Sequence, residues 1–127
     1  MRLPKTVPTD VELEVLQVIW RRGQATVREV HQDLVQNRKI AYTTVLTIMG
    51  ILERKGHLKK TAGERAYVYS PARPKRRVVK TMIDEFVSRV FNGSTRPLLV
   101  HLVEDSRISQ KELKEIEGLL KGRLRRS

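Results

Sequence analysis

The segment from residue 42 to residue 55 carries side chains that can read the edges of nucleic-acid bases. Its hydrophobic residues recur at helical spacing on one side, and its other side presents Thr43, Leu46, Thr47 and Gly50. A helix face meant only for solvent usually carries Lys and Glu, but this face is uncharged and made of short side chains. Threonine can hydrogen-bond to bases or phosphates, and its methyl group can touch a thymine methyl. The pattern therefore favours a helix that approaches a nucleic acid.

Two further helices are predicted before this segment. Thr9 with Glu12 and Thr26 with Glu29 form capping-box pairs, each of which opens an apolar stripe at helical spacing. Gly23 ends the first helix, and the polar residues after the second helix form a turn. The second helix is expected to cover about residues 26–36.

A hairpin is predicted directly after the helix of residues 42–55. Two strands are expected at residues 58–61 and 66–70, because Tyr67 and Tyr69 alternate with Val68. The turn between them ends in a basic residue, Arg65. A helix and a β-ribbon thus follow each other in the chain, and both shapes fit nucleic-acid grooves.

The charge balance agrees with a polyanionic partner. The chain has 127 residues with 26 Lys+Arg against 14 Asp+Glu, a formal net charge of +12, and 39% hydrophobic residues support a globular fold. There is no cysteine, which excludes disulfides and thiolate metal sites. Residues 1–10 lack the apolar run of a signal peptide, and no stretch reaches the roughly 20 apolar residues needed to cross a bilayer. We expect a cytoplasmic protein without direct membrane insertion.

Enzymatic activity is not expected. The three histidines have no metal-ligand spacing around them, so no metal site or cofactor is predicted. The Thr-x-x-Glu pairs are helix caps rather than acid–base pairs, and the chain contains neither a glycine-rich phosphate loop nor a nucleophile elbow. Two other kinds of protein remain as alternatives: a winged-helix module for protein assembly, and an RNA-binding module. The basic hairpin argues against the first, and an aromatic content of 5% argues against the second.

The second half of the chain is predicted to be helical. Its first helix is interrupted by Asn92, Gly93 and Ser94, and Ser109 with Glu112 forms a third capping-box pair that opens the last helix.

This second half is also predicted to self-associate. Pro71, Pro74 and the basic residues 75–77 mark a boundary, so we expect one domain over residues 1–73 and another over 74–127. Chains as short as this second half rarely sustain a core alone, which favours an intertwined homodimer. The alternative is one monomeric core with the first domain. The predicted dimer surface consists of Val79, Met82, Ile83, Phe86, Val90, Leu99, Leu102, Val103, Leu113, Ile116 and Leu120.

Several motifs in sequence order resemble the penicillinase-repressor family, which comprises the repressors of β-lactamase and methicillin-resistance genes and their copper-responsive relatives. The motifs are ELEVL at residues 12–16, IW at 19–20, ATVREV at 25–30, AYTTV at 41–45, KG at 55–56, RAYVY at 65–69 and LVHLVE at 99–104. The resemblance implies a mainly α protein with a winged helix-turn-helix DNA-binding domain, three helices plus a hairpin wing, followed by a helical dimerisation domain. It also implies a homodimer that represses transcription from an inverted-repeat operator.

The resemblance implies two modes of induction, and this chain departs from the pattern of both. The copper-responsive members bind metal through cysteines, which are absent here. The lactam-responsive members are cleaved in the dimerisation half by a pathway that begins at a membrane-bound sensor protease. At the matching position this chain has His101-Leu102 where Asn-Phe is expected. We therefore retain His101 and Leu102 as a candidate cleavage site.

The expected DNA-binding surface combines the second helix, the third helix and the wing. Its residues are Thr26, Arg28, Tyr42, Thr43, Thr44, Leu46, Thr47, Arg54, Lys60 and Arg65. Thr43, Leu46 and Thr47 are expected at base edges, and Arg65 in a minor groove or on the backbone.

Other members of this set have a second interpretation that the residues leave open. Thr26 and Thr44 can cap helices, Tyr42 can close the core instead of binding phosphate, and Arg54 and Lys60 can simply be solvated. The basic residues 75–77 can follow phosphates or form an exposed linker.

Overall fold

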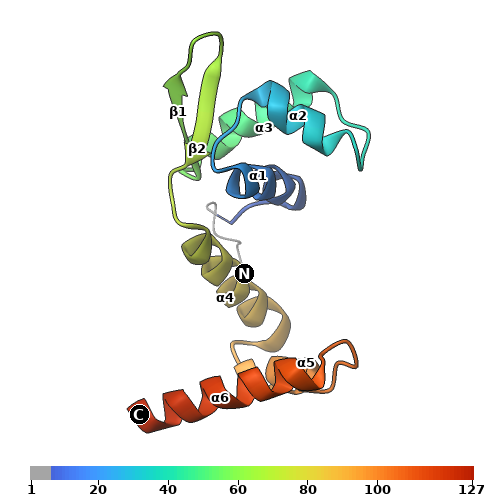
Figure 1. Ribbon diagram of the computed structural model, residues 1–127, viewed down its shortest axis with the longest axis vertical. Coiled ribbons are helices and arrows are strands. Elements are labelled where there is room, and N and C mark those ends of the chain that lie inside the picture. Colours follow the sequence, from blue (N-terminus) through green and yellow to red (C-terminus); the bar gives the residue numbers. More distant parts are fainter. Residues whose placement is uncertain (1–6) are drawn as a thin grey trace. The chain divides into compact units, whose positions relative to one another are not determined.

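The computed structural model describes residues 7–127 (Figure 1). Its elements are α1 (Asp10–Arg22), α2 (Val27–Leu34), α3 (Tyr42–Arg54), β1 (Leu58–Ala62), β2 (Tyr67–Pro71), α4 (Lys75–Phe91), α5 (Thr95–Val103) and α6 (Gln110–Arg126). The chain divides after Glu85 into two compact units. In the described residues, no helix combines the length and the apolar character that spanning a membrane would require.

The predicted capping boxes open three of these helices. The Thr9 hydroxyl accepts from the Glu12 N–H at 3.3 Å, and the Glu12 carboxylate accepts from the Thr9 N–H at 3.1 Å. The same reciprocal pair forms between Thr26 and Glu29 at the start of α2 and between Ser109 and Glu112 at the start of α6. These bonds satisfy amides that a helix start otherwise leaves without an acceptor.

The hydrophobic stripes of α1, α2 and α3 meet in one core. Its members are Val15, Leu16, Val18, Ile19, Ala25, Val27, Val30, Leu34, Val45, Met49, Leu52, Leu58, Tyr69 and Val78. Burying a Leu or Ile side chain contributes about 1.5–3 kcal/mol, so this core dominates the stability of the first unit. Because Val45, Met49 and Leu52 of α3 point into it, the opposite face of α3 lies at the surface.

The hairpin is joined to the helices by backbone hydrogen bonds. β1 and β2 are antiparallel, and Tyr69 also bridges to Ala25 through bonds of 2.9 and 2.8 Å between their N–H and C=O groups. Ala62 belongs to β1 rather than to the predicted turn. Tyr69 is buried in the core, whereas Tyr67, two residues closer to the tip, is 55% exposed because it extends beyond the helices.

The expected boundary between residues 73 and 74 differs from the observed division after residue 85. The reason is the first half of α4, whose Val78 is 4% exposed within the first core and whose Met82 packs against that core. Val79 is also half-buried. Val79 and Met82 were both expected on a dimer surface, and both are thus only partly exposed within a single chain.

The second unit buries little of its apolar surface. Asn92 and Gly93 adopt positive φ angles and end α4, as the sequence predicted, and α5 and α6 follow. Neither α5 nor α6 contains a buried residue. Within this unit Phe91 packs edge-on against Phe86, with ring centroids 5.8 Å apart, and Val87 is buried.

Two ion-pair groups connect α1 to its neighbours in the first unit. Asp33 of α2 accepts two hydrogen bonds from Arg22 and one from Arg21. These bonds, mainly those from Arg22, hold the pKa of Asp33 below its ordinary value. These bonds therefore stabilise the folded state fully at pH values above the ordinary pKa of Asp33. This stabilisation is lost as the pH falls through the lowered pKa of the folded state. Glu12, which is 6% exposed, pairs with Lys55 after α3 at 2.7 Å.

We expect Glu12→Gln to lower the free energy of unfolding by about 1–3 kcal/mol, because it neutralises a buried carboxylate that two partners bind. Glu14→Gln is the matched control, since Glu14 forms an exposed pair with Arg38, and its effect should stay below about 1 kcal/mol. Urea unfolding followed by circular dichroism measures both. Equal losses in the two variants would contradict a special role for the Glu12–Lys55 pair.

Candidate nucleic-acid interface

The outer face of α3 is uncharged and open to solvent. Thr43, Thr47 and Leu46 are exposed, the last to 46%, while Val45 and Met49 beside them are fully buried. This is the division that the sequence predicted for this helix. A smooth face of this kind allows the helix to enter the major groove, which is wide enough for an α-helix.

The two threonines are linked along the helix. The Thr47 hydroxyl donates to the Thr43 carbonyl at 3.0 Å, so its oxygen lone pairs and its methyl group remain available outward. Thr44 does not cap α3, because Ala41 is the N-cap residue and no side chain bonds to the first turn. The capping alternative for Thr44 is therefore wrong, and its side chain is exposed.

A hollow of about 210 Å³ lies where α2, α3 and the wing meet. The residues that line it are Thr26, Val27, Arg28, Tyr42, Leu46, Ala66, Tyr67 and Tyr69. The hollow brings together four residues of the expected DNA surface from separate parts of the chain. The wing residues Ala66, Tyr67 and Tyr69 were not predicted here, because the wing is brought against α2 by contacts between distant residues such as the Ala25–Tyr69 bridge.

Tyr42 lies at the rim of this hollow rather than in the core. Its side chain is 46% exposed, and its ring meets His31 edge-on at a centroid distance of 5.8 Å. The His31 Nε2 atom lies 3.0 Å from the Ile40 carbonyl oxygen, which orients the imidazole. His31 therefore supports Tyr42, a role that sequence spacing did not reveal.

The start of α2 retains donors that can meet an anion. The capping box uses the Thr26 hydroxyl and the amides of Thr26 and Glu29. The amides of Val27 and Arg28 belong to the first helical turn and have no acceptor within the helix. The Arg28 side chain is exposed on the same turn. Thr26 is thus a cap, as one interpretation held, and the neighbouring groups remain available for a phosphate.

The two basic residues expected in the wing differ in their surroundings. Lys60 lies 4.6 Å from the centre of the Tyr67 ring and 3.8 Å from a Glu53 oxygen, so part of its charge is already compensated. Arg65 at the tip is exposed and forms no ion pair among residues 7–127. The tip is tight: the Gly63 N–H donates to the Ala66 carbonyl at 3.0 Å, and a Cβ at Gly63 would lie 2.5 Å from that oxygen. Arg65 is therefore the freer charge.

The remaining basic residues lie in two separate places. Arg54 lies one turn beyond the outer face of α3 and passes 3.6 Å from the position of a Cβ on Gly50. Residues 75–77 form the first turn of α4 rather than a linker, and Lys75 lies 5.5 Å from the centre of the Trp20 ring. Among the described residues, no group of three or more His, Cys, Asp or Glu could hold a metal ion.

Comparison with known proteins identifies this arrangement. The family model described as penicillinase repressor matches residues 8–122. The penicillinase repressor of Bacillus licheniformis is 27% identical over 118 residues, which cover 91% of this chain and 92% of that protein. The transcriptional regulator BlaI of Mycobacterium tuberculosis is 35% identical over 97 residues, covering 75% and 70% of the two chains.

A solved structure supports the same relationship. The solution structure of monomeric Bacillus licheniformis BlaI in complex with the blaP half-operator matches with a TM-score of 0.50 at 30% identity, over 58% of this chain and 88% of that one. These relatives are repressors and regulators of transcription rather than enzymes. The chain is therefore a member of the penicillinase repressor family, with a winged helix-turn-helix fold in its first unit.

Proposed function

We propose that this protein represses transcription by binding an inverted-repeat operator as a homodimer. The observation that carries the proposal is the hollow that Arg28 of α2, Leu46 of the uncharged α3 face and Ala66 of the wing, the neighbour of the exposed Arg65, line together. A groove-reading face close to charges that can bind phosphates is the arrangement that duplex recognition requires. The half-operator complex of the BlaI relative supports the assignment.

In this proposal α3 enters the major groove with its first turn. Thr43, Leu46 and Thr47 then meet base edges, where the hydroxyls hydrogen-bond and the Leu46 side chain packs on a thymine methyl. The α2 amides of Val27 and Arg28 bind a backbone phosphate. These phosphate contacts supply affinity, while the α3 side chains supply discrimination between sequences.

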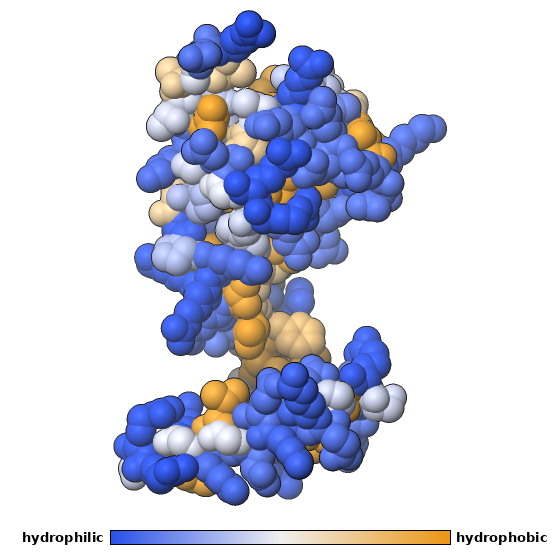
Figure 2. All heavy atoms as spheres, viewed as in Figure 1, coloured by the Kyte–Doolittle hydropathy of each residue, from blue (hydrophilic) through white to orange (hydrophobic). Residues whose placement is uncertain are grey.

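The homodimer part of the proposal rests on the second unit. Most of its exposed large apolar residues belong to the surface predicted from the sequence: Phe86, Val90, Leu99, Leu102, Val103 and Leu120. Hydrophobic side chains are visible there among hydrophilic ones at the surface of α5 and α6 (Figure 2). So many exposed apolar side chains in one small unit are typical of an interface between protein chains. Two DNA-binding units would then read half-sites about 10 bp apart, or a multiple of that spacing.

We further propose that proteolysis at His101-Leu102 releases the operator. Both residues are exposed on α5, and the His101 ring lies 6.2 Å from the Phe91 ring. A cut there separates Leu102, Val103 and all of α6 from the rest of the chain. The loss of this apolar surface would weaken the dimer and, with it, the binding of two half-sites.

Operator binding is tested with the full chain, its own upstream intergenic DNA and an unrelated duplex, at two salt concentrations. We expect tight binding to the upstream DNA alone, and log–log salt dependence with a slope of about −0.9 per neutralised phosphate. Fluorescence anisotropy gives both affinities, and an RNA copy of the upstream sequence tests the RNA-binding alternative. Equal affinity for all three ligands would refute operator-specific repression.

Arg65→Met should weaken binding to the upstream DNA by about 1–3 kcal/mol, because the wing tip then lacks its groove or phosphate contact. Arg125→Met removes the same charge from α6, outside the proposed surface, and should leave the affinity nearly unchanged. The anisotropy titration compares the two. Identical affinities of both variants and the parent chain would show that the wing does not contact DNA.

Leu120→Gln should shift the protein toward monomers in sedimentation velocity and weaken binding to an intact operator more than to a half-site. A polar side chain in an apolar interface loses buried area and must desolvate its amide. Lys114→Gln on the same helix is the control and should remain dimeric. A chain ending at His101 should behave like Leu120→Gln; if it stays dimeric, release by cleavage at this bond is wrong.

A further inference from the structure

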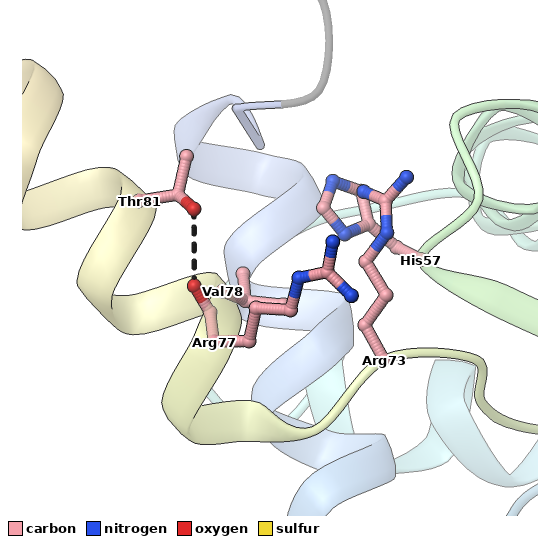
Figure 3. Close-up of a pocket in the computed structure, with 5 residues that line it drawn as sticks. All are labelled: His57, Arg73, Arg77, Val78 and Thr81. Atoms are coloured by element: carbon pink, nitrogen blue, oxygen red, sulfur yellow. Dashed lines mark hydrogen bonds between the residues drawn. The ribbon is translucent and has the colours of Figure 1, made fainter.

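A basic pocket of about 170 Å³ lies within the first unit, formed by residues outside the surface described for DNA (Figure 3). Its lining residues are His57, Arg73, Arg77, Val78 and Thr81. They come from the junction between α3 and β1, the segment before α4 and the first turns of α4. Two guanidinium groups and an imidazole thus share one small space, and none of the described residues that line it is a carboxylate.

Backbone bonds hold one side of this pocket in place. The His57 N–H donates to the Leu52 carbonyl and the Ala72 N–H donates to the His57 carbonyl, each at 2.9 Å. His57 is only 3% exposed. Arg73, next to Ala72, is therefore held beside the buried imidazole.

Gly56 allows the Arg73 guanidinium to approach closely. A Cβ at Gly56 would lie 2.8 Å from the Arg73 Nη2 atom, and Gly56 has a φ of +83°, a conformation that other residues rarely adopt. The guanidinium group therefore rests directly on the backbone at this turn. Its position is determined by packing rather than by an acidic partner.

Arg77 approaches from α4. In Figure 3 its side chain extends toward Arg73 and His57. Thr81, one turn later, donates its hydroxyl hydrogen to the Arg77 carbonyl at 3.1 Å, and Val78 forms an apolar wall. The pocket therefore offers nitrogen donors on one side and a hydrophobic surface on the other.

The two arginines of the pocket have no carboxylate partner among residues 7–127. Arg21, Arg22, Arg38 and Arg107 pair with carboxylates, whereas in residues 7–127 neither Arg73 nor Arg77 has such a pair. The six residues before these contain no Asp or Glu. Like charges repel each other, and an anion bound between the two guanidinium groups would offset that repulsion.

We propose that the basic pocket binds a small phosphate-class oxyanion. Guanidinium groups form paired, charge-assisted hydrogen bonds to phosphate oxygens, which a tetrahedral anion can offer to Arg73 and Arg77 together. The volume is below the roughly 300 Å³ at which drug-sized sites begin, so the ligand is inorganic phosphate or the phosphate group of a small metabolite. The bound anion joins α4 to the α3–β1 junction. This inference is independent of operator binding.

The test is a titration of the full chain with inorganic phosphate at constant ionic strength, set with chloride and followed by amide chemical shifts. We expect saturable shifts in the backbone around His57 and residues 73–81. Arg77→Met should bind about tenfold more weakly or worse, and Arg77→Lys, which retains the charge but not the paired donors, should be intermediate. Arg76→Met removes a neighbouring charge that does not line the pocket and should bind as the parent does.

Two results would overturn the proposal. One is the absence of saturable shifts, or equal phosphate affinity in the Arg77→Met and parent proteins. The other concerns the source of the phosphate: if duplex DNA produces the same shifts and phosphate competes with it, the pocket is a backbone contact of DNA rather than a small-anion site. A parallel titration with glucose 6-phosphate that produces the same saturable shifts would extend the proposal to phosphorylated metabolites.

Discussion

The burial of the inner stripe of α3 is the constraint on which the rest of the first unit depends. Val45, Met49 and Leu52 are fully buried against α1 and α2, so α3 cannot rotate about its axis without exposing them. A helical residue advances by about 100° around the axis, so burial of one face dictates which residues form the other. Thr43, Leu46 and Thr47 are outward for this reason.

The wing depends on a second constraint, the pairing of Tyr69 with Ala25. An isolated two-stranded hairpin is marginally stable in water. Here the two bonds to Ala25 add a third short segment to the hairpin, and the Tyr69 side chain enters the core. The hairpin base is thereby attached to the start of α2, while the tip with Arg65 remains exposed. Helix α3 and the wing thereby belong to one packed unit, as the proposed recognition of a duplex at two points requires.

Polar interactions contribute less to the stability of this framework than burial of the hydrophobic core does. Exposed pairs contribute little, but Glu12 is buried and connects α1 to the end of α3 through Lys55. Asp33 connects α2 to the end of α1 through Arg22 and Arg21. The second unit differs from the first, because its apolar residues remain exposed and few of its side chains are buried. A second copy of the chain is the cover that we propose.

Local patterns in the sequence were sufficient to predict most elements of this protein. Capping boxes depend on residues three apart, and helical stripes on residues three and four apart, so the starts of α1, α2 and α6 and the outer face of α3 could be read directly. The family resemblance, carried by motifs in order, was confirmed by the comparisons. Tertiary structure alone decided the contacts between distant residues. The Ala25–Tyr69 bridge, the hollow beside Tyr42, the packing of Val78 and Met82 that moves the boundary to residue 85, and the meeting of His57 with Arg73 and Arg77 all join separate segments. No local pattern encodes such contacts, because they arise only when burial of the common core selects which faces meet.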